Sequence, residues 1–321
     1  MNIHSTNVSL VTEIILLGFQ NIQNLRIFFF LLLLAIFCVT LCGNLLIIVV
    51  VSYSRSLHSP MYFFLTQLAF SDILLSTSIV PNLLSLILYE GRSVSFVGCL
   101  TQFYFFTASG ELECLLLAVM SYDRYQAICN PLHYATVMDL AFCLKAIVAF
   151  WMIILAIALM FSITMSYLWF CGPNVIDHFF CDFDPILELS CSDTFIIKTE
   201  GLFLVLPLII FPFTLIMISY ISIIVTILKM SSVTMRYKTF STSGSHLAVV
   251  SMYYGSLFSM YSFKNWESEK KILSLLYTVV TPLLNPMIYS LSNNEMKKVI
   301  KILFRKISTF FCQQENTIWS I

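Results

Sequence analysis

Long apolar runs, separated by short polar segments, make up most of this chain. Five of the runs contain no Asp, Glu, Lys or Arg; they are residues 27–54, 146–176, 201–228, 239–263 and 272–294. Two more, at about 61–88 and 99–122, are interrupted only by Asp72 and by Glu111 and Glu113. Each run exceeds the roughly 20 apolar residues that a helix needs to cross a bilayer, and none shows the alternation of a membrane barrel strand. The pattern therefore predicts a bundle of seven transmembrane helices.

The composition agrees with a bundle in lipid. Hydrophobic residues make up 59% of the 321 residues and charged residues only 11%, whereas soluble domains carry about 25% charged residues. Asp and Glu together number 17, and so do Lys and Arg, so the net charge favours neither nucleic acid nor another highly charged partner. We therefore predict an all-α membrane protein and exclude ordinary soluble enzymes and nucleic-acid-binding proteins.

The distribution of Lys and Arg sets the expected orientation. With the C-terminus inside, eleven of the 17 basic residues lie on the cytoplasmic side and six outside, which is the usual bias. Asn7-Val8-Ser9 is a glycosylation sequon, which is meaningful only on the outer side. We expect an extracellular segment 1–26, a seven-helix bundle 27–292 and a cytoplasmic segment 293–321, in a multi-pass protein of the cell membrane without a cleaved signal peptide.

The segment after the last run has the pattern of a short helix on the membrane surface. Its apolar residues recur at steps of three and four; they are Met296, Val299, Ile300, Leu303 and Ile307. Lysine and arginine fill the positions between them, as in helices that lie on anionic lipid. We predict an amphipathic helix here, with membrane lipids as its partner.

Four polar side chains fall at one depth of the predicted bundle. At 1.5 Å per residue, Asp72 and Glu113 lie about 16–18 Å from the cytoplasmic boundary. Asn44 lies at a similar depth in the first span, and Asn285 can reach the same layer from the last span. Ionisable groups inside a membrane are costly, and two adjacent carboxylates do not both stay ionised without a cation or a shared proton. Our hypothesis is a sodium or proton site, with no other cofactor; the alternative is a polar cluster that only fixes the helix register.

Glu111 cannot belong to that layer. It is two residues before Glu113, which on a helix turns it by about 200° away. We expect it to line a ligand cavity or to face a neighbouring helix.

Four of the ten cysteines lie on the predicted outer side; they are Cys99, Cys171, Cys181 and Cys191. That compartment permits disulfides, and four cysteines allow three pairings, among which the residues alone do not choose. A bond from Cys99, at the start of the third span, to the long outer loop would draw that loop across the mouth of the bundle.

Several local strings together resemble rhodopsin-like (class A) G-protein-coupled receptors, and within them the olfactory receptor family. The strings are PMYFFL at 60–65, MSYDRYQAIC at 120–129, PLHY at 131–134, KTFSTSGSHL at 238–247 and PLLNPMIYSL at 282–291. They occur in the family's order, and the resemblance extends from about residue 18 to 305. Glu113 matches a glutamate typical of the family, whereas Glu111 is an additional acid.

The resemblance implies an odorant receptor that binds a small volatile or lipophilic molecule in its outer half and activates a stimulatory heterotrimeric G protein, raising cAMP. The residues of the third span that lie above the polar layer belong to the expected ligand site; they are Phe103, Phe106, Thr107, Gly110 and Glu111. To these the resemblance adds Leu204, Leu208, Tyr254, Leu257, Tyr261 and Thr278. It assigns coupling and activation to Asp123, Arg124, Tyr125, Tyr220, Lys238, His246, Asn285, Pro286 and Tyr289, with Asp123 paired to Arg124 at rest. In line with it we predict a disulfide between Cys99 and Cys181, and leave Cys171 and Cys191 as a candidate second pair.

Three alternatives remain open at this point. Another class A receptor, for a peptide, an amine or a lipid, shares the same pattern, and Glu111 keeps an amine ligand in view. An ion-coupled transporter or channel would use the intramembrane acids as a path, although no matched broken segments suggest duplicated halves. An intramembrane enzyme is disfavoured because neither a zinc-binding nor a serine nucleophile motif occurs.

Overall fold

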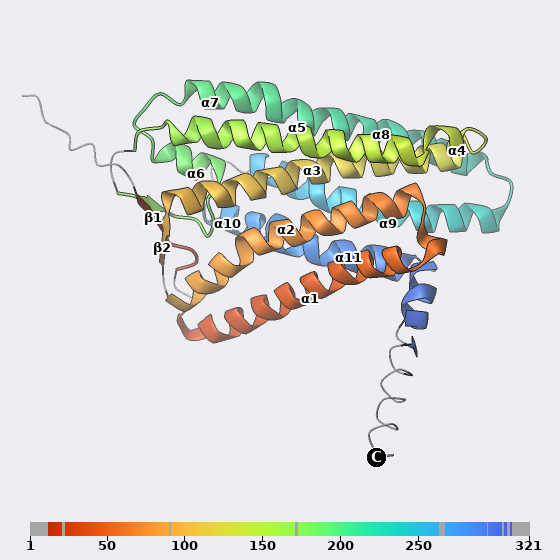
Figure 1. The fold of residues 1–321 in the computed structure, drawn as a ribbon, viewed down its shortest axis with the longest axis horizontal. Helices are drawn as coiled ribbons and strands as arrows, with labels where there is room; N and C mark the ends of the chain where they lie inside the picture. Colours follow the sequence, from red (N-terminus) through yellow and green to blue (C-terminus); the bar gives the residue numbers. More distant parts are fainter. Residues whose placement is uncertain are drawn as a thin grey trace, which may run out of the picture.

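The computed structural model is an elongated bundle of long helices that run side by side (Figure 1). It describes residues 12–20, 23–89, 91–170, 173–262, 267–293, 295–303, 305–306 and 309. The predicted glycosylation site Asn7 and the predicted disulfide partner Cys171 lie outside these residues.

The long helices follow the apolar runs. They are α1 (Arg26–Tyr53), α2 (Pro60–Tyr89), α3 (Phe96–Cys129), α5 (Leu140–Ser166), α8 (Leu206–Lys229), α9 (Val233–Ser262) and α11 (Thr281–Ser292). A π-helical turn, η3 (Gly201–Val205), joins α7 (Phe195–Glu200) to α8, and another, η4 (Leu276–Val280), joins α10 (Glu267–Leu275) to α11. The short helices are η1 (Gln23–Leu25), η2 (Arg55–Leu57), α4 (Tyr134–Val137) and α6 (Phe183–Glu188). The strands are β1 (Glu13–Leu16), β2 (Arg92–Ser95) and β3 (Val175–Ile176).

Six helical stretches among the described residues are long and apolar enough to cross a membrane. The helix α9, in the place of the run 239–263, is long enough but is not among them. Its composition explains the difference, because Ser, Thr, Tyr and His occupy many of its positions and lower its mean hydropathy. The chain is thus a predominantly helical multi-pass membrane protein in which one long helix is more polar than the rest.

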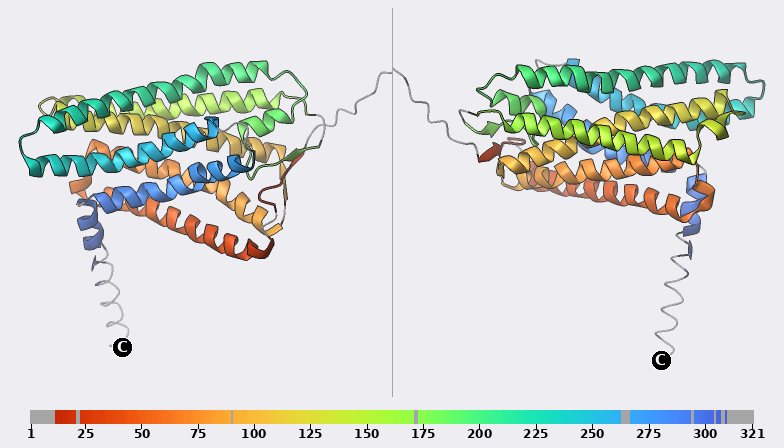
Figure 2. Two further views of the ribbon diagram at one scale, coloured as in Figure 1. Left: turned by 180° about the vertical axis from the view of Figure 1, so that it is seen from behind. Right: turned by 45° about the horizontal axis from the view of Figure 1, so that its top comes forward.

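Helix α3 is the centre of the bundle. Of its apolar window, 78% is buried, compared with 28% in α1 and 11% in the stretch 195–229. It packs against α2, α5, α8 and α9, and the further views of Figure 2 show it enclosed by other helices. The helices at the periphery of the bundle expose large apolar side chains, such as Phe28, Phe211 and Leu228. This is expected where the surrounding solvent is lipid.

One predicted boundary is wrong by a wide margin. The run 146–176 reads as one span, but α5 ends at Ser166. The apolar residues beyond it belong to the end of the bundle that the charge bias predicts to be extracellular, which is called the outer end below; the opposite end is called the inner end. Phe170 and Ile176 are buried there in a second hydrophobic cluster. Hydropathy alone does not separate a side chain that faces lipid from one that is buried in a loop.

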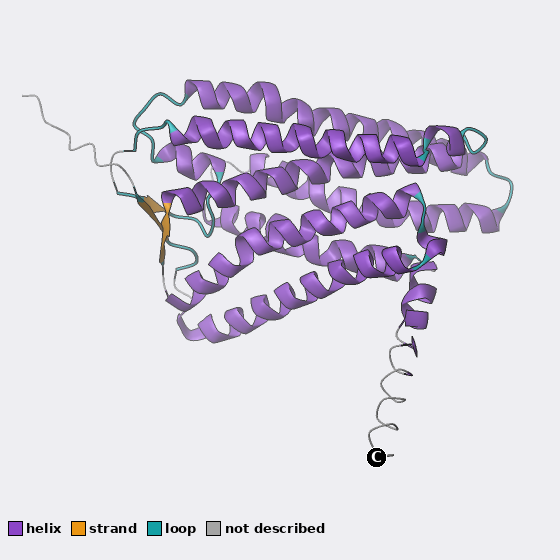
Figure 3. Cartoon of the chain, viewed as in Figure 1, coloured by secondary structure: helices purple, strands orange, loops and turns teal. Residues whose placement is uncertain are grey.

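The outer end also contains a small sheet that the sequence analysis did not predict. Strand β1 lies between β2, to which it is antiparallel, and β3, to which it is parallel (Figure 3). Ile14 and Leu16 point into the second hydrophobic cluster and are fully buried, whereas Ile15 is 42% exposed. The segment before the first long helix is therefore part of the folded outer end.

Replacing Leu16 with alanine should destabilise the outer end. The substitution removes a fully buried side chain, which costs about 2–5 kcal/mol. We expect Leu16→Ala to lower both the melting temperature of the detergent-purified protein and its level at the cell surface. Ile15→Ala, one residue away on the exposed face, is the matched control; equal losses in the two variants would contradict the observed burial of β1.

Candidate functional site

A buried amide connects two acids in the middle of the bundle. Asn285 of α11 donates its Nδ2 hydrogens to both carboxyl oxygens of Asp72 on α2, each at 3.1 Å, and to Oε1 of Glu113 on α3 at 3.2 Å. All three side chains are no more than 1% exposed. Asn44 is equally buried but donates instead to the carbonyl oxygens of Thr40 and Pro282. Three of the four residues expected in one layer are thus in direct contact, and the fourth binds the backbone of the helix that carries Asn285.

Two amide oxygens of this polar layer receive no hydrogen bond. Oδ1 of Asn44 and Oδ1 of Asn285 are buried without a hydrogen-bond partner. Among the described residues no group of three His, Cys, Asp or Glu side chains could hold a metal ion. Two carboxyl groups with unpaired amide oxygens fit a single monovalent cation or a proton.

Close backbone packing holds the layer in register. A Cβ atom added at Gly43 of α1 would lie 3.2 Å from the ring of Pro286 on α11. That distance is tighter than ordinary contact, so a glycine lets the two helices approach beside Asn285.

An aromatic layer lies toward the outer end from the two acids. Phe106 of α3 packs edge-on against Phe180 of the outer loop, with ring centroids 4.8 Å apart, and against Tyr277 of η4 at 6.0 Å. Tyr277 contacts Tyr253 of α9 at 5.6 Å, and the Tyr253 hydroxyl donates to the Gly110 carbonyl oxygen at 2.8 Å. The predicted ligand residues Phe106 and Gly110 therefore lie together, with three aromatic residues that the prediction omitted.

The other residues of the predicted ligand set are spread over several surfaces. Tyr254 packs on Phe213 of α8 at 4.9 Å. Thr278 is fully buried and donates to the Ser274 carbonyl of its own helix. The rest are Phe103, buried in the outer cluster, Thr107, half-buried on α3, Leu208, packed beside Ala108, and Leu257, packed against the central core. The side chain of Tyr261 lies outside the described residues.

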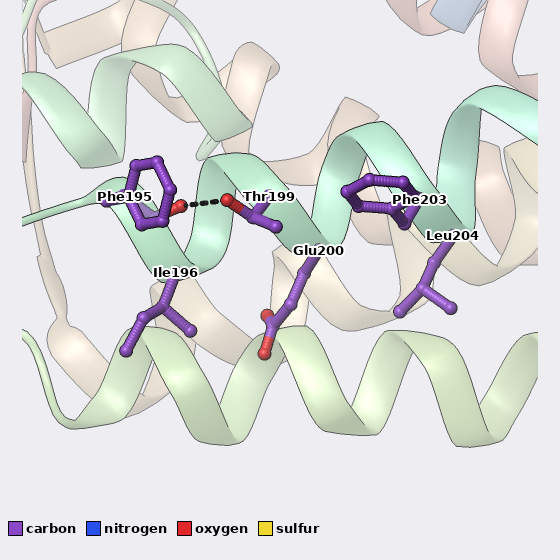
Figure 4. A pocket seen from close by; sticks show the side chains of 6 residues that line it. All are labelled: Phe195, Ile196, Thr199, Glu200, Phe203 and Leu204. Carbon is purple, nitrogen blue, oxygen red and sulfur yellow. Dashed lines mark hydrogen bonds between the residues drawn. The ribbon is translucent and has the colours of Figure 1, made fainter.

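Leu204 lines a different cavity. A groove of about 310 Å³ lies against α7 and η3, lined by Phe195, Ile196, Thr199, Glu200, Phe203 and Leu204 (Figure 4). Phe195 and Phe203 are each 69% exposed, so this groove faces outward. Glu200 accepts a hydrogen bond from Thr164 of α5 at 3.1 Å, which joins the two helices beneath the groove.

The outer loop is tied to the bundle by a covalent bond and by an amide. Cys99 at the start of α3 is disulfide-bonded to Cys181, as the family resemblance implied. Cys191 is also disulfide-bonded. Gln102, which the sequence analysis overlooked, accepts from the Cys181 amide at 3.0 Å and donates to the Ser78 carbonyl at 2.9 Å. The loop thus lies across the end of the bundle, and its tie to α2 and α3 is a buried glutamine as well as the disulfide.

The same loop carries two titratable groups with altered pKa values. Burial, together with the charge of Lys271, lowers the pKa of His178 to about 4, and burial raises the pKa of Asp182 to about 6. Lys271 forms an ion pair with Asp177 at 2.6 Å and donates to the Gly18 carbonyl at 3.0 Å. These contacts join the outer loop, the N-terminal segment and α10.

At the inner end, Asp123 has a different partner from the expected one. It accepts a hydrogen bond from the Tyr134 hydroxyl at 2.8 Å, and among the described residues it forms no ion pair with Arg124, which is half-buried. The reason is local: α4 brings Tyr134 directly against the inner end of α3.

The remaining inner residues belong to α3, α8, α9 and α11. The Tyr220 hydroxyl and His246 Nδ1 are 2.5 Å apart, and the Tyr289 hydroxyl is buried without a hydrogen-bond partner. Tyr125 is half-buried and stacks on Tyr122. The side chain of Lys238 lies outside the described residues.

The comparison with known families decides among the open alternatives. A sequence model described as "Olfactory receptor" matches residues 33–306. The chain belongs to the olfactory receptor family. It is similar to human Olfactory receptor 10A7, with 47% identity over 298 residues that cover 92% of this chain and 94% of that protein. It is also 44% identical to rat Olfactory receptor 1500 over 307 residues, covering 94% of this chain and 98% of that protein.

Membership of this family makes the chain a class A G-protein-coupled receptor and not an enzyme. A third relative, human Olfactory receptor 11L1, is 44% identical over 303 residues and is covered to 94%, as is this chain. The motifs that suggested the resemblance are therefore part of a match that runs through nearly the whole bundle.

His178 should make the outer loop of this olfactory receptor sensitive to acid. Its pKa falls from an ordinary 6.5 to about 4, so between these values the unfolded chain takes up a proton that the folded loop excludes. Stability is then full above pH 6.5 and is lost as the pH falls toward 4, by about 3 kcal/mol in all. Asp182 has the opposite effect over part of this pH range, because its raised pKa makes the folded state more stable as the pH falls. The measurement is therefore made in a variant that carries Asp182→Asn, so that only His178 contributes.

We expect the melting temperature to fall less steeply between pH 7 and about 4.5 when His178→Gln is added to that background. Glutamine keeps a polar group opposite Ser274, which is 3.4 Å from His178 Nε2, but does not titrate. Parallel pH profiles with and without His178→Gln would contradict this assignment.

Proposed function

We propose that this chain is an odorant receptor that binds a small volatile or lipophilic molecule in the outer half of its bundle, activates a stimulatory heterotrimeric G protein and raises cAMP. The observation that carries the proposal is the olfactory receptor match over residues 33–306. The aromatic layer of Phe106, Tyr253 and Tyr277 supports the ligand half, because aromatic walls with a few hydroxyl groups suit small apolar molecules.

We further propose that α9 is the seventh helix that crosses the membrane. Helix α9 packs against α3, α8 and α11, and two of its larger polar side chains are turned inward: His246 and Tyr253 are each 1% exposed, whereas Phe258 is 74% exposed. A crossing helix with this distribution presents apolar groups to lipid despite its lower mean hydropathy. With seven crossings, the charge bias of the loops puts the N-terminus outside and the C-terminus inside.

The helical segment 295–303 is proposed to lie on the inner leaflet. Met296 and Val299 are buried against the central core, while Lys297, Lys298 and Lys301 are exposed. The segment turns away from the axis of the bundle (Figure 1), which suits a basic helix that contacts anionic lipid.

Activation follows from a choice between two packings of the bundle. A ligand shifts that equilibrium only by the difference in its affinity for the two arrangements. At the inner end, the half-buried Arg124 lies close enough for its charge to act on three buried groups, the Tyr220–His246 pair and the Tyr289 hydroxyl. We infer that the active arrangement presents Arg124 to the G protein.

Arg124→Ala should abolish ligand-dependent cAMP production. Cells that contain an olfactory-type stimulatory G protein are screened with odorants, and the responsive odorant is then applied to the variant. We expect the response to disappear because the cation that faces the G protein is gone, while the receptor still reaches the surface, as read by antibody against an N-terminal tag on intact cells.

Lys145→Ala is the matched control, since it removes an exposed inner-end cation from α5 without touching α3. A full response in Arg124→Ala would refute the coupling role. A tag that is accessible only after permeabilisation would refute the orientation.

The polar layer is proposed as the site of an allosteric monovalent cation. Asp72, Glu113 and Asn285 would hold sodium together with the unpaired oxygen of Asn44, and the bound charge would let both acids stay ionised. A cation that fits only one packing stabilises that packing.

Sodium should therefore reduce agonist potency in membranes, by about 5-fold or more relative to N-methylglucamine at equal ionic strength. Asp72→Asn should abolish this difference, because the amide removes the charge that attracts the ion. Glu188→Gln, on the exposed outer loop, should leave it intact. Persistence of the sodium effect in Asp72→Asn would rule out a cation at this layer.

A further inference from the structure

Glu111 is a buried acid that neither the polar layer nor the aromatic layer uses. Its side chain is 7% exposed, and both of its carboxyl oxygens are buried without a hydrogen-bond partner. Glu113, two residues further, receives a hydrogen bond from Asn285. Buried polar groups are nearly always satisfied, so two unpaired oxygens on one carboxyl group call for an explanation.

Helix geometry shows which neighbours Glu111 faces. Residues three, four and seven positions away lie on the same side of a helix. On one flank of Glu111 these positions hold Ala108, Leu115 and Tyr104, and on the other they hold Thr107, Cys114 and Ala118. The first three belong to a small cluster that α3 forms with Ile154 and Ala158 of α5 and with Leu208 of α8, whereas Cys114 is 2.9 Å from the Tyr253 hydroxyl of α9. One flank of Glu111 therefore lies on the seam between α3, α5 and α8, away from Asn285 and the polar layer.

No basic residue of the facing helices lies at the depth of Glu111. In α5 the basic residue is Lys145, near the start of the helix, and in the stretch 195–229 they are Lys198 and Lys229, near its two ends. The cluster on this flank of Glu111 consists of apolar side chains and one tyrosine. The cost of burying this carboxylate is not offset by a positive side chain of the described protein.

The same seam continues toward the outer end. The groove of Figure 4 includes Leu204, and Leu208, four residues further, packs in the cluster on this flank of Glu111. The π-helical turn Gly201–Val205 forms one end of the groove and joins α8, and such turns often occur at functional sites. An outward-facing groove and an unpaired acid thus lie along the same seam.

We propose that Glu111 recognises a protonated amine, so that the ligand is a small primary or secondary amine with an apolar body. The inference rests on the proposed odorant-receptor function and names its ligand class. An ammonium group has at least two N–H donors, one for each unpaired oxygen, and its charge lets the carboxylate stay ionised in a medium of low dielectric constant. The apolar body would pack against Ala108, Ile154 and Leu208. An alcohol of the same shape offers one donor and no charge.

The test uses volatile amines, each paired with the alcohol of the same carbon skeleton, in the cAMP assay with the full-length receptor. We expect at least one amine to activate the wild type more potently than its alcohol. Glu111→Gln keeps the shape and removes the charge, so it should raise the EC50 of that amine roughly 10- to 100-fold and change the response to the alcohol little. Glu188→Gln, which removes an exposed acid from the outer loop, should leave both responses unchanged.

Ligand chemistry provides the same test without a mutation. The N-acetyl derivative of the active amine is uncharged, and it should be inactive on the wild type even if Glu111→Gln fails to reach the surface. An active N-acetyl derivative, equal losses for amine and alcohol in Glu111→Gln, or a panel in which alcohols activate and amines do not would overturn the amine assignment and leave the receptor function standing. If no odorant of either kind activates a receptor that is present at the surface, the proposed function fails as well.

Discussion

In lipid, a polar side chain inside the bundle has to find its partner within the protein, and this constraint explains the central contacts of the structure. Asn285 donates to Asp72 and to Glu113, and so connects α11 with α2 and α3 at one level. Asn44 adds α1 by donating to the Pro282 carbonyl. Pro286, four residues further along α11, has no N–H to donate to that carbonyl, so the polar layer also satisfies the backbone. Four helices are thereby held in one register by groups that have no alternative partner in the hydrocarbon.

The outer end is held together differently, because it lies where water meets lipid. Its order comes from apolar burial around the disulfide: Phe179, Phe180 and Cys181 are fully buried, together with Ile14 and Leu16 of the N-terminal strand. Lys271 then pairs with Asp177 and binds the Gly18 carbonyl. Since three separate parts of the chain meet here, the outer loop is a fixed wall beside the aromatic layer. A ligand that enters from the outside must pass that wall, or enter from the bilayer side.

The sequence was most informative where one physical rule acts alone. Apolar length predicted the helices, and a count of residues along α2 and α3 predicted that Asp72 and Glu113 share a depth. It was less informative where two rules compete. The residues that follow Ser166 are as apolar as a span, but they fold into the outer cluster. Strand β1 has only four residues, and its partners are far away in the chain, so no local pattern reveals it. Asp123 binds Tyr134 because α4 lies against α3, a contact that depends on the path of a loop.

Glu111 and Glu113 show how the face of a helix determines the role of an acid. Both belong to the central helix and both are buried, so neither residue type nor depth in the bundle distinguishes them. Glu113 faces the side where an asparagine donor is built into α11, and its burial is partly offset inside the protein. One flank of Glu111 faces apolar and small residues from α5 and α8, and among the described residues no donor reaches its carboxyl oxygens. An acid of the first kind contributes to the architecture of the bundle. An acid of the second kind leaves part of its desolvation cost uncompensated, and that remaining free energy is available to whichever molecule brings the missing donors.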